Sequence, residues 1–387
     1  MLRAMRVCLV YDCLFPYTVG GAERWYRNVA ECLAGEGHEV TYVTLRQWPH
    51  GEQLDVDPRV RVVVAGPRMA LYTDQRRRVL PPIVFGAGVF LHLLRHGRSY
   101  DVVHTASFPY FSLLAAALLR PLMGYRLVVD WHEAWSRGYW RDYLGRVGGG
   151  IGYLVQRACI RVPQRAFCFS QLYARRLRES GLRSEPIVLA GQYTGPFDTP
   201  VPRAVEPIVV FAGRLIPEKR AGLAVASFAA AAARIKGLRG EFYGDGPTRA
   251  DLLREISAQG LEDAVNAPGF IDSAEIDSAL RGAMCMLSTS RREGYGLIVV
   301  EAAARATPSI VVAGEDNAAT ELVSDGVNGF VVGRDDPEAI ADAIVRVHEA
   351  GLALRESTAR WFAEHATDLS LRHSLQTVLE SYSDGSS

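Results

Sequence analysis

Short apolar runs rich in Val, Ile and Phe alternate along the chain with longer segments of helical periodicity. Residues 5–12 (MRVCLVYD) and 39–45 (EVTYVTL) are predicted to be buried strands, and the helix between them ends at Gly35 or Gly37. This strand–helix–strand order is typical of parallel sheets. Further strands are expected in the runs VRVVVAG, YDVVHTA, RLVVDWH, RAFCFS and IVLA.

The pattern pauses at residues 191–206, which are rich in Gly and Pro and lack periodicity, so we expect a linker there. It resumes with strands in PIVVFAGRL, GEFYGDG, AVNAPGF, MCMLSTS, SIVVAG and GFVVGRD, and with helices at 221–235 and after Gly296. The fold class predicted is α/β, with two doubly wound, Rossmann-like domains facing a cleft. They cover residues 1–190 and 207–365, and the tail at 366–387 is expected to cross back to the first domain.

The length of 387 residues suits two domains, and the charge differs between the two halves. The first 190 residues contain 25 Arg, no Lys and 15 acidic residues, whereas the net charge of the whole chain is zero. A basic half favours an anionic partner, such as a phosphorylated acceptor or an anionic membrane surface near the basic runs at 76–78 and 95–98. A solvated Arg-rich surface is an equal alternative, and no nucleic acid partner is expected.

The six cysteines lack C-x-x-C spacing, so they are predicted to be free thiols in a reducing cytoplasm. The apolar run in the first residues is short, so we do not expect a signal peptide there. The longest apolar stretch, 83–94, is shorter than the ~20 residues that cross a bilayer, so it packs in the core or lies on a membrane. We therefore expect a cytoplasmic protein, with peripheral attachment to the inner face of the membrane left open.

The segment FAGRLIPEKR at 211–220 is a candidate anion site. A strand ends at Gly213, and Arg214 and Lys219 follow beside a predicted helix start. The positive end of the helix dipole adds there to the charge of the two side chains and favours an anion. The chain has only two lysines against 41 arginines, so Lys219 stands out as a compact point charge. A salt-bridged loop is the alternative.

The segment EGYGLIVVE at 293–301 places carboxylates at both ends of an apolar run. Gly294 and Gly296 interrupt regular structure, so a helix is expected to begin near Gly296 with free N–H groups at its start. A carboxylate beside a diphosphate is repelled unless it faces hydroxyl groups. We therefore expect Glu293 and Glu301 each to hold a sugar, although solvated charges are the commoner reason for such residues.

Five motifs occur together in order: G-G-A-E at 20–23, G-R-L-x-P-E-K at 213–219, G-D-G-P at 244–247, E-G-Y-G-L-x-V-V-E-A at 293–302 and A-T-E-L-V-x-D-G-x-N-G-F-V-V at 319–332. In this the chain resembles the retaining glycosyltransferases of family 4, which have the GT-B fold. The resemblance is specific across 207–345 and looser before. It implies transfer of a sugar from a UDP- or GDP-sugar to a hydroxyl of a sugar, lipid-linked or small-molecule acceptor, without metal or another cofactor. Cell-envelope polysaccharide, glycolipid or natural-product synthesis is the implied setting.

The resemblance also implies residue roles on the donor side. Arg214 and Lys219 would neutralise the diphosphate, Glu293 would hold hydroxyls of the transferred sugar, and Glu301 would hold the ribose. The remaining implied donor residues are the glycines that admit the first loop (Gly20, Gly21), the amides that reach the phosphates (Gly296, Leu297, Ile298) and the segments framing the base (Gly244, Gly246, Phe270, Ile271).

In the first half, His132 matches the histidine that such enzymes aim at the 6-position of the donor sugar. His104 matches a second recurrent histidine more weakly, on the acceptor side. Trp135 and Tyr139 belong to an aromatic cluster that stacks on a sugar, contacts a lipid or closes the edge of the core.

Some residues depart from the family pattern. Arg220 stands where Gly is frequent, and the linker lacks the usual N-G-V-D turn. Two other classes remain open: a nucleotide-sugar epimerase, which needs acid and base carboxylates, and a non-catalytic nucleotide-sugar-binding protein, which would be expected to lose Lys219 or Glu293. A dehydrogenase is disfavoured because no G-x-G-x-x-G follows the first strand.

Overall fold

The computed structural model describes residues 4–18, 20–73, 76–198 and 200–383. These residues form two compact units. The first combines the described residues of Met1–Ala190 with those of Arg372–Ser387, and the second is Gly191–Leu371. The expected linker at 191–206 therefore clusters with the second unit, as do residues 366–371 at the start of the expected tail.

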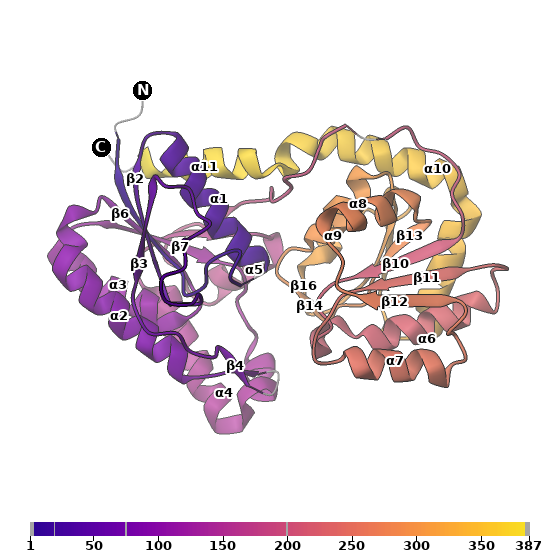
Figure 1. The fold of residues 1–387 in the computed structure, drawn as a ribbon, viewed down its shortest axis with the longest axis horizontal. Coiled ribbons are helices and arrows are strands. Elements are labelled where there is room, and N and C mark those ends of the chain that lie inside the picture. Colours follow the sequence, from indigo (N-terminus) through magenta and orange to yellow (C-terminus); the bar gives the residue numbers. More distant parts are fainter. Residues whose placement is uncertain (1–3, 19, 74–75, 199, 384–387) are drawn as a thin grey trace. The chain divides into compact units, whose positions relative to one another are not determined.

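The first unit is built on a parallel seven-stranded sheet of order β3-β2-β1-β6-β7-β8-β9 (Figure 1). All seven strands lie in runs predicted from the apolar pattern: β1 (Arg6–Val10), β2 (Glu39–Thr44), β3 (Val60–Val64), β6 (Val102–Ala106), β7 (Arg126–Trp131), β8 (Arg165–Cys168) and β9 (Ile187–Val188). A short hairpin, β4 (Tyr72–Thr73) with β5 (Arg76–Arg77), precedes β6. The side chains of the basic residues at 76 and 77 lie outside the described part.

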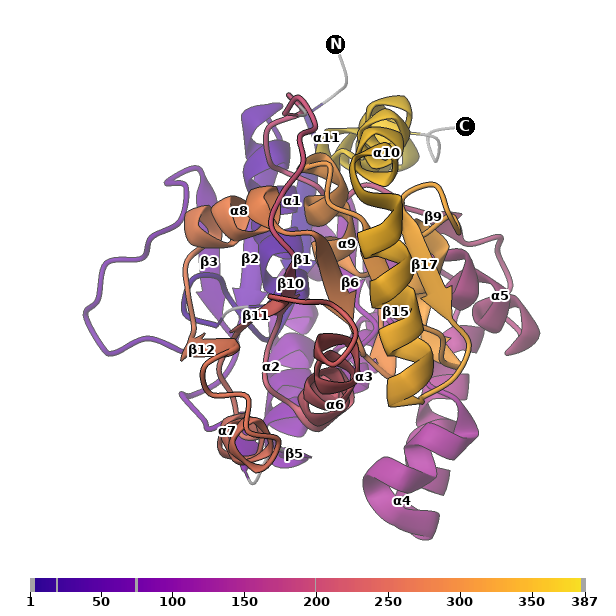
Figure 2. The same cartoon turned by 90° about the vertical axis from the view of Figure 1, so that its right-hand side faces the viewer.

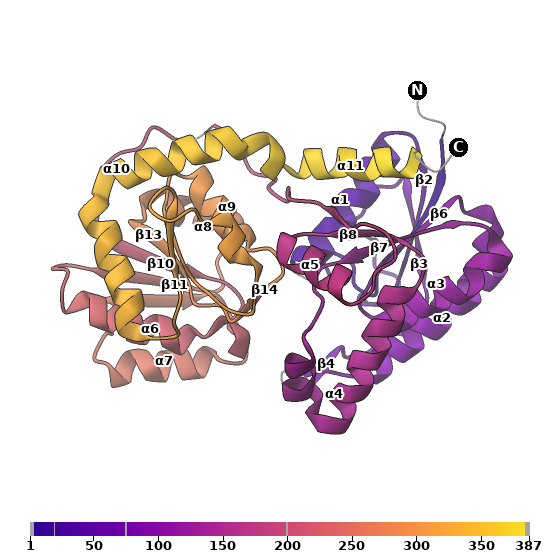
Figure 3. The same cartoon turned by 180° about the vertical axis from the view of Figure 1, so that it is seen from behind.

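Helices cover both faces of this sheet. Figures 1 and 3 show α1 (Gly21–Gly35) and α11 (Leu371–Ser383) on one face and α2 (Leu80–His96) and α3 (Tyr110–Met123) on the other. The unit also contains α4 (Arg137–Arg161), which is kinked at Gly145, and α5 (Gln171–Glu179). The apolar stretch at 83–94 thus lies within α2, and no helix in the described ranges is long and apolar enough to cross a membrane.

The second unit repeats this architecture with a parallel six-stranded sheet of order β12-β11-β10-β13-β15-β17. Its strands also follow the predicted runs: β10 (Ile208–Ala212), β11 (Arg239–Tyr243), β12 (Val265–Gly269), β13 (Cys285–Ser288), β15 (Ser309–Val312) and β17 (Gly329–Val332). Two short strands, β14 (Arg292–Glu293) and β16 (Asp316–Asn317), pair separately. The helices are α6 (Ala221–Ala232), α7 (Arg249–Ala258), α8 (Ser273–Gly282), α9 (Leu297–Ala304) and α10 (Pro337–Leu369).

Two hydrophobic cores lie on opposite faces of this second sheet because side chains alternate along each strand. In β10, Val209 and Phe211 pack with α6, α7 and α10, whereas Val210 packs with α8 and α9. The side chains of β13 and β15 are divided between the two cores in the same way. Figure 2 shows α10 running along one side of β15 and β17. The α/β class with two doubly wound parallel sheets is therefore confirmed.

The strand order reverses between β10 and β13 in the second unit and between β1 and β6 in the first. At such a switch point the connections after neighbouring strands leave in opposite directions, so their loops leave room for a ligand at the carboxyl ends. In the second unit these are the loop from Gly213 to Arg220 and the loop from Thr289 to Gly296.

Candidate active site

The two loops at the switch point of the second unit are bonded to each other. The main-chain N–H of Arg291 donates to the carbonyl of Glu218 over 2.8 Å, and the Thr289 hydroxyl donates to the carbonyl of Lys219 over 2.8 Å. These bonds fix the backbone around Lys219 against the end of β13. The loops that carry the predicted cation, Lys219, and the predicted carboxylate, Glu293, are therefore held together by hydrogen bonds.

Lys219 and Glu293 form an ion pair between Nζ and Oε1. The same carboxylate oxygen accepts from the Ser290 hydroxyl over 2.7 Å. Both charged side chains are partly buried, with 21% and 15% of their surface exposed, so the pair is only partly accessible. Glu293 sits on β14, which is aligned with β16, where the Asn317 amide donates to the carbonyl of Ser290 over 2.9 Å.

Arg214 projects from a loop that is held against the G-D-G-P segment. The N–H of Leu215 donates to the carbonyl of Asp245, and the N–H of Thr248 donates to that of Leu215. Gly244 has φ +140°, and a Cβ there would lie 1.9 Å from the carbonyl oxygen of Gly213, so only glycine permits this approach. Arg214 is exposed and pairs with no carboxylate within the described residues.

The start of α9 supplies unpaired N–H groups, as predicted for any helix N-terminus. Gly296 is the N-cap at φ +103°, where a Cβ would lie 2.5 Å from Cβ of Ala319, and no described side chain caps the helix. The only residues of α9 that are not fully buried are Leu297, Ile298 and Glu301. All three were predicted as donor residues, and they form the accessible side of this helix.

The segment proposed to frame the base follows β12. Phe270 leaves 74% of its surface exposed directly after the strand end, and Ile271 is partly exposed. A large aromatic side chain that is left uncovered at a strand end offers a stacking surface. Gly246 lies on the neighbouring loop after β11.

Arg220 occupies the left-handed region, with φ 51° and ψ 49°, where glycine is usual. Its side chain holds the position through a bond from Nε to the carbonyl of Thr289, over 2.6 Å, and an ion pair with Asp335. The departure from the family pattern is thus accommodated by contacts that a glycine does not make.

In the first unit, the G-G-A-E segment is the beginning of α1. Gly20 is the N-cap and Gly21 the first helical residue, and the Glu23 carboxylate fills the space that a Cβ of Gly20 would occupy. A side chain at position 20 would therefore displace Glu23, and the approach of this loop to a donor stays a prediction.

His132 directly follows β7 and is fixed by aromatic rings. Its imidazole lies flat on Phe169, with ring centroids 4.5 Å apart and planes 1° apart, and the Tyr26 ring contacts it at 6.2 Å. Nε2 is buried and has no hydrogen-bond partner in the described part of the chain. Burial lowers the pKa of His132 to about 4, although the Asp130 carboxylate opposes the shift, so the ring is neutral at neutral pH.

His104 is not a contact residue in this structure, contrary to the acceptor-side prediction. It has no exposed surface, and its two ring nitrogens lie 2.7 Å from Asp130 Oδ1 and 2.6 Å from the Tyr382 hydroxyl. A strand-end histidine and a core histidine look alike in sequence, and only the tertiary contacts separate them.

The two aromatic residues predicted on the acceptor side differ in exposure. Trp135 is partly exposed and packs against Tyr139, Trp140 and Tyr143 at centroid distances of 4.8, 4.7 and 5.3 Å. Its indole N–H donates to Glu133 over 2.6 Å. Tyr139 is buried, so of the two predicted residues only Trp135 presents accessible surface.

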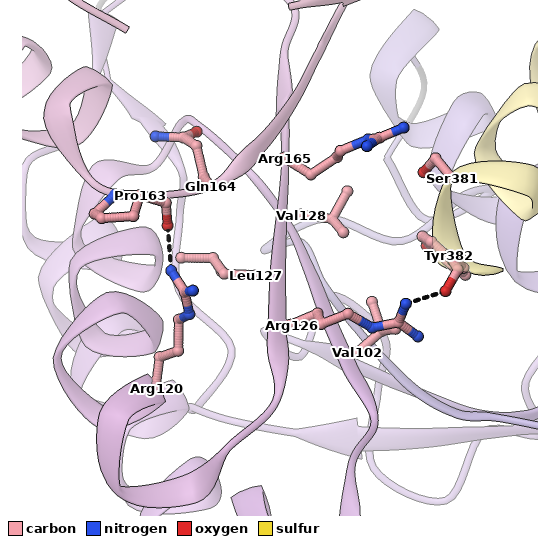
Figure 4. Close-up of a pocket in the computed structure, with 10 residues that line it drawn as sticks. All are labelled: Val102, Arg120, Arg126, Leu127, Val128, Pro163, Gln164, Arg165, Ser381 and Tyr382. Carbon is pink, nitrogen blue, oxygen red and sulfur yellow. Dashed lines mark hydrogen bonds between the residues drawn. The ribbon is translucent and has the colours of Figure 1, made fainter. Parts of the chain in front are cut away.

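A cavity of about 250 Å³ in the first unit lies away from all these residues. Figure 4 shows it at the amino ends of β6, β7 and β8, beside α11, lined by Arg120, Arg126 and Arg165 among others. It is at the opposite edge of the sheet from His132, so it is not part of the candidate site.

The chain matches two family descriptions, one in each unit: Glycosyltransferase Family 4 over residues 19–190 and Glycosyl transferases group 1 over residues 200–362. The chain belongs to glycosyltransferase family 4. The order-preserving but loose motifs of the first half and the specific motifs of the second therefore come from one family.

Similar proteins carry glycosyltransferase names. The chain is 32% identical over 141 residues to alpha-D-kanosaminyltransferase of Streptomyces kanamyceticus, a match to 36% of either chain. It is 26% identical to D-inositol 3-phosphate glycosyltransferase of Corynebacterium urealyticum over 94% of this chain and 90% of that one. The match thus spans about a third of the length of the first relative and most of the second.

Solved structures show the same fold. Sucrose-phosphate synthase of Thermosynechococcus elongatus superposes with a TM-score of 0.78 at 20% identity and 98% coverage of both chains. HepE of Anabaena, solved with UDP, superposes with a TM-score of 0.72 at 18% identity. The match covers 98% of this chain and all of that one. The chain therefore has the GT-B fold.

Sequence reasoning missed several residues that hold the site together. The Ser290 hydroxyl donates to the Glu293 carboxylate, and Asn317 holds Ser290 through its main-chain carbonyl. Asn317 belongs to β16, just before the fifth motif. Asp130 and Tyr382 bond to His104 although they stand 26 and 278 residues away from it. No spacing rule in the sequence links residues so far apart.

Proposed function

We propose that this glycosyltransferase moves a sugar from a UDP- or GDP-sugar to a hydroxyl acceptor with retention of anomeric configuration. One observation carries the proposal: Arg214, the Lys219–Glu293 pair and the uncapped start of α9 surround the switch point of one sheet. The complex of the similar HepE protein with UDP supports a nucleotide diphosphate donor.

The reaction breaks the bond between the anomeric carbon and the leaving diphosphate and forms a bond from that carbon to the acceptor oxygen. The acceptor proton passes to an oxygen of the leaving phosphate, so no protein base is required. Negative charge grows on the diphosphate, where Arg214, Lys219 and the α9 N–H groups stabilise it because their positions are fixed in advance. As Lys219 turns to phosphate, Glu293 is released to accept hydrogen bonds from sugar hydroxyls.

A donor panel tests this proposal. Purified protein is given UDP-, GDP- and ADP-sugars with sugar and lipid-linked acceptors, and the product's anomeric configuration is read by NMR. We expect retention, and activity that EDTA does not abolish. Donor epimerisation without an acceptor would favour an epimerase, and nucleotide binding without turnover would favour a non-catalytic protein.

We further propose that the first unit rests on an anionic membrane surface on the cytoplasmic side, through a face formed by α2 and α3. These helices pack against each other and contain no acidic residue. Their outward apolar side chains keep between 44% and 68% of their surface exposed: Ile83, Leu91, Leu94, Leu118 and Leu122. Arg95 and Arg120 lie at the ends of the two helices, so the face combines apolar area with positive charge.

Vesicle flotation tests the membrane face. Wild-type protein is expected to float with vesicles containing phosphatidylglycerol and less with pure phosphatidylcholine. Leu118→Glu with Leu122→Glu should lose binding, whereas Val201→Glu with Leu253→Glu, two exposed apolar positions of the second unit, should retain it. Absence of wild-type binding to both vesicles would end the proposal.

A further inference from the structure

Tyr382 of α11 is held at both ends by the strands of the first unit. Arg126, at the start of β7, donates to the main-chain carbonyl of Tyr382 (Figure 4). The Tyr382 hydroxyl lies 2.6 Å from Nδ1 of His104, in the neighbouring strand β6. Only 1% of the tyrosine is exposed, so the last helix of the chain is fixed to the sheet by a buried side chain.

The chain of hydrogen bonds continues to α1. His104 Nε2 lies 2.7 Å from Oδ1 of Asp130, and the indole N–H of Trp25 donates to Oδ2 over 2.7 Å. Burial raises the pKa of Asp130, but the contacts with His104, His132 and Trp25 outweigh it and lower the pKa overall, so the carboxylate is ionised and only accepts. An imidazole that donates from Nε2 to Asp130 and accepts a hydrogen bond from the Tyr382 hydroxyl at Nδ1 satisfies all three groups.

The same residues surround His132. His132 directly follows β7, and the Asp130 carboxylate, two positions earlier in the strand, lies close enough to its imidazole to interact with it electrostatically. Trp25 packs edge-on against Phe169 at 5.1 Å, and Phe169 is the ring on which His132 lies. Tyr26, the next residue of α1, contacts both histidines at 5.9 and 6.2 Å.

We propose that Tyr382 is a positioning residue that, through His104 and Asp130, sets the orientation of His132 and of the start of α1. Tyr382 itself does not touch reacting atoms. Removing its hydroxyl leaves the buried Nδ1 of His104 without a donor, so the imidazole reorients and Asp130 loses a partner. Docking of α11 thereby sets the orientation of His132, the histidine that we expect at the donor sugar. The inference rests on the proposed function only for the contact between His132 and that sugar.

Tyr382→Phe tests the proposal because it removes one oxygen atom and keeps the ring. The matched control is Tyr125→Phe: Tyr125 is also buried in the first unit, and its hydroxyl donates to the carbonyl of Ala116 over 2.6 Å, outside the network. The readouts are the imidazole NMR signals of His132 and the ratio of kcat to donor KM. We expect Tyr382→Phe to shift the His132 signals and lower kcat about tenfold, while Tyr125→Phe changes neither.

Arg126→Gln is the second variant, since it releases the main-chain end of Tyr382 without touching His104. It should shift the His132 signals in the same direction. Unchanged His132 signals in Tyr382→Phe, or equal changes in Tyr382→Phe and Tyr125→Phe, would overturn the proposal. The NMR readout needs no activity, so failure of sugar transfer in the wild-type protein would refute the proposed function and leave this test intact.

Discussion

The two units share a doubly wound architecture but place different chemistry at the carboxyl ends of their strands. In the second unit the strand ends lead into an accessible cation, a carboxylate and free N–H groups, centred on Lys219 and Glu293. In the first unit they lead into a network of the completely buried Asp130 and His104 and the partly exposed His132. An equivalent fold thus supports a charged ligand site in one unit and a packed aromatic and imidazole site in the other.

The largest expected effect concerns the independence of the two cores. Phe228 of α6 and Phe167 of β8 are both completely buried, one in each unit. Replacing a buried Phe by Ala costs about 3–5 kcal/mol. In differential scanning calorimetry, Phe228→Ala should lower the unfolding temperature of the second unit. Phe167→Ala should lower the unfolding temperature of the first unit. If both variants shift one common transition, the two units unfold together.

The next effect concerns the cation of the second unit. Lys219→Ala should lower kcat about 10²–10³-fold, because a fixed positive group at the developing charge is lost. Lys236→Ala is the matched control, as Lys236 is the other lysine of the chain and is exposed beyond the end of α6. Steady-state kinetics with circular dichroism of both variants make the comparison. Near-normal turnover of folded Lys219→Ala would contradict the leaving-group role.

A third prediction uses the pH response of the first unit. His132 has a pKa of about 4, below the ordinary value of about 6.5, because burial disfavours its charged form. The unfolded chain then binds a proton between these pH values and the folded chain does not, so this group lowers stability as pH falls from 6.5 to 4. An NMR titration of the imidazole should give a midpoint near 4, and a midpoint near 6.5 would show that the ring is not enclosed.

The smallest effect concerns Arg220. Arg220→Gly relieves a left-handed backbone conformation that costs about 1–2 kcal/mol, but it removes the contacts to Thr289 and Asp335. The two changes oppose each other, so the free energy of unfolding measured by chemical denaturation should change by less than about 1 kcal/mol. A much larger loss would show that the side chain, and not the backbone shape, holds Lys219 in place.

The strands and the site of the second unit could be predicted because their determinants are local. A short apolar run marks each strand, and Gly213, Gly244 and Gly296 lie within short motifs that mark strand ends or the start of a helix. Arg214, Lys219 and Glu293 could thus be named from motifs alone. The pairing of Lys219 with Glu293 could not, because 74 residues separate them.

The site of the first unit was less predictable because it depends on contacts between distant segments. His104 was expected on the acceptor side, but it is completely buried, and its ring nitrogens contact Asp130 and Tyr382, the latter from the last described helix. The apolar run at 83–94 was read correctly as too short to span a bilayer, yet only the helix shows which of its residues remain exposed.

A crystal structure of the protein with UDP or GDP tests the central claim most directly. The diphosphate should lie on Arg214, Lys219 and the N–H groups of Leu297 and Ile298, with the Lys219–Glu293 ion pair opened. A diphosphate bound elsewhere, with that ion pair intact, would contradict the assignment of the donor site.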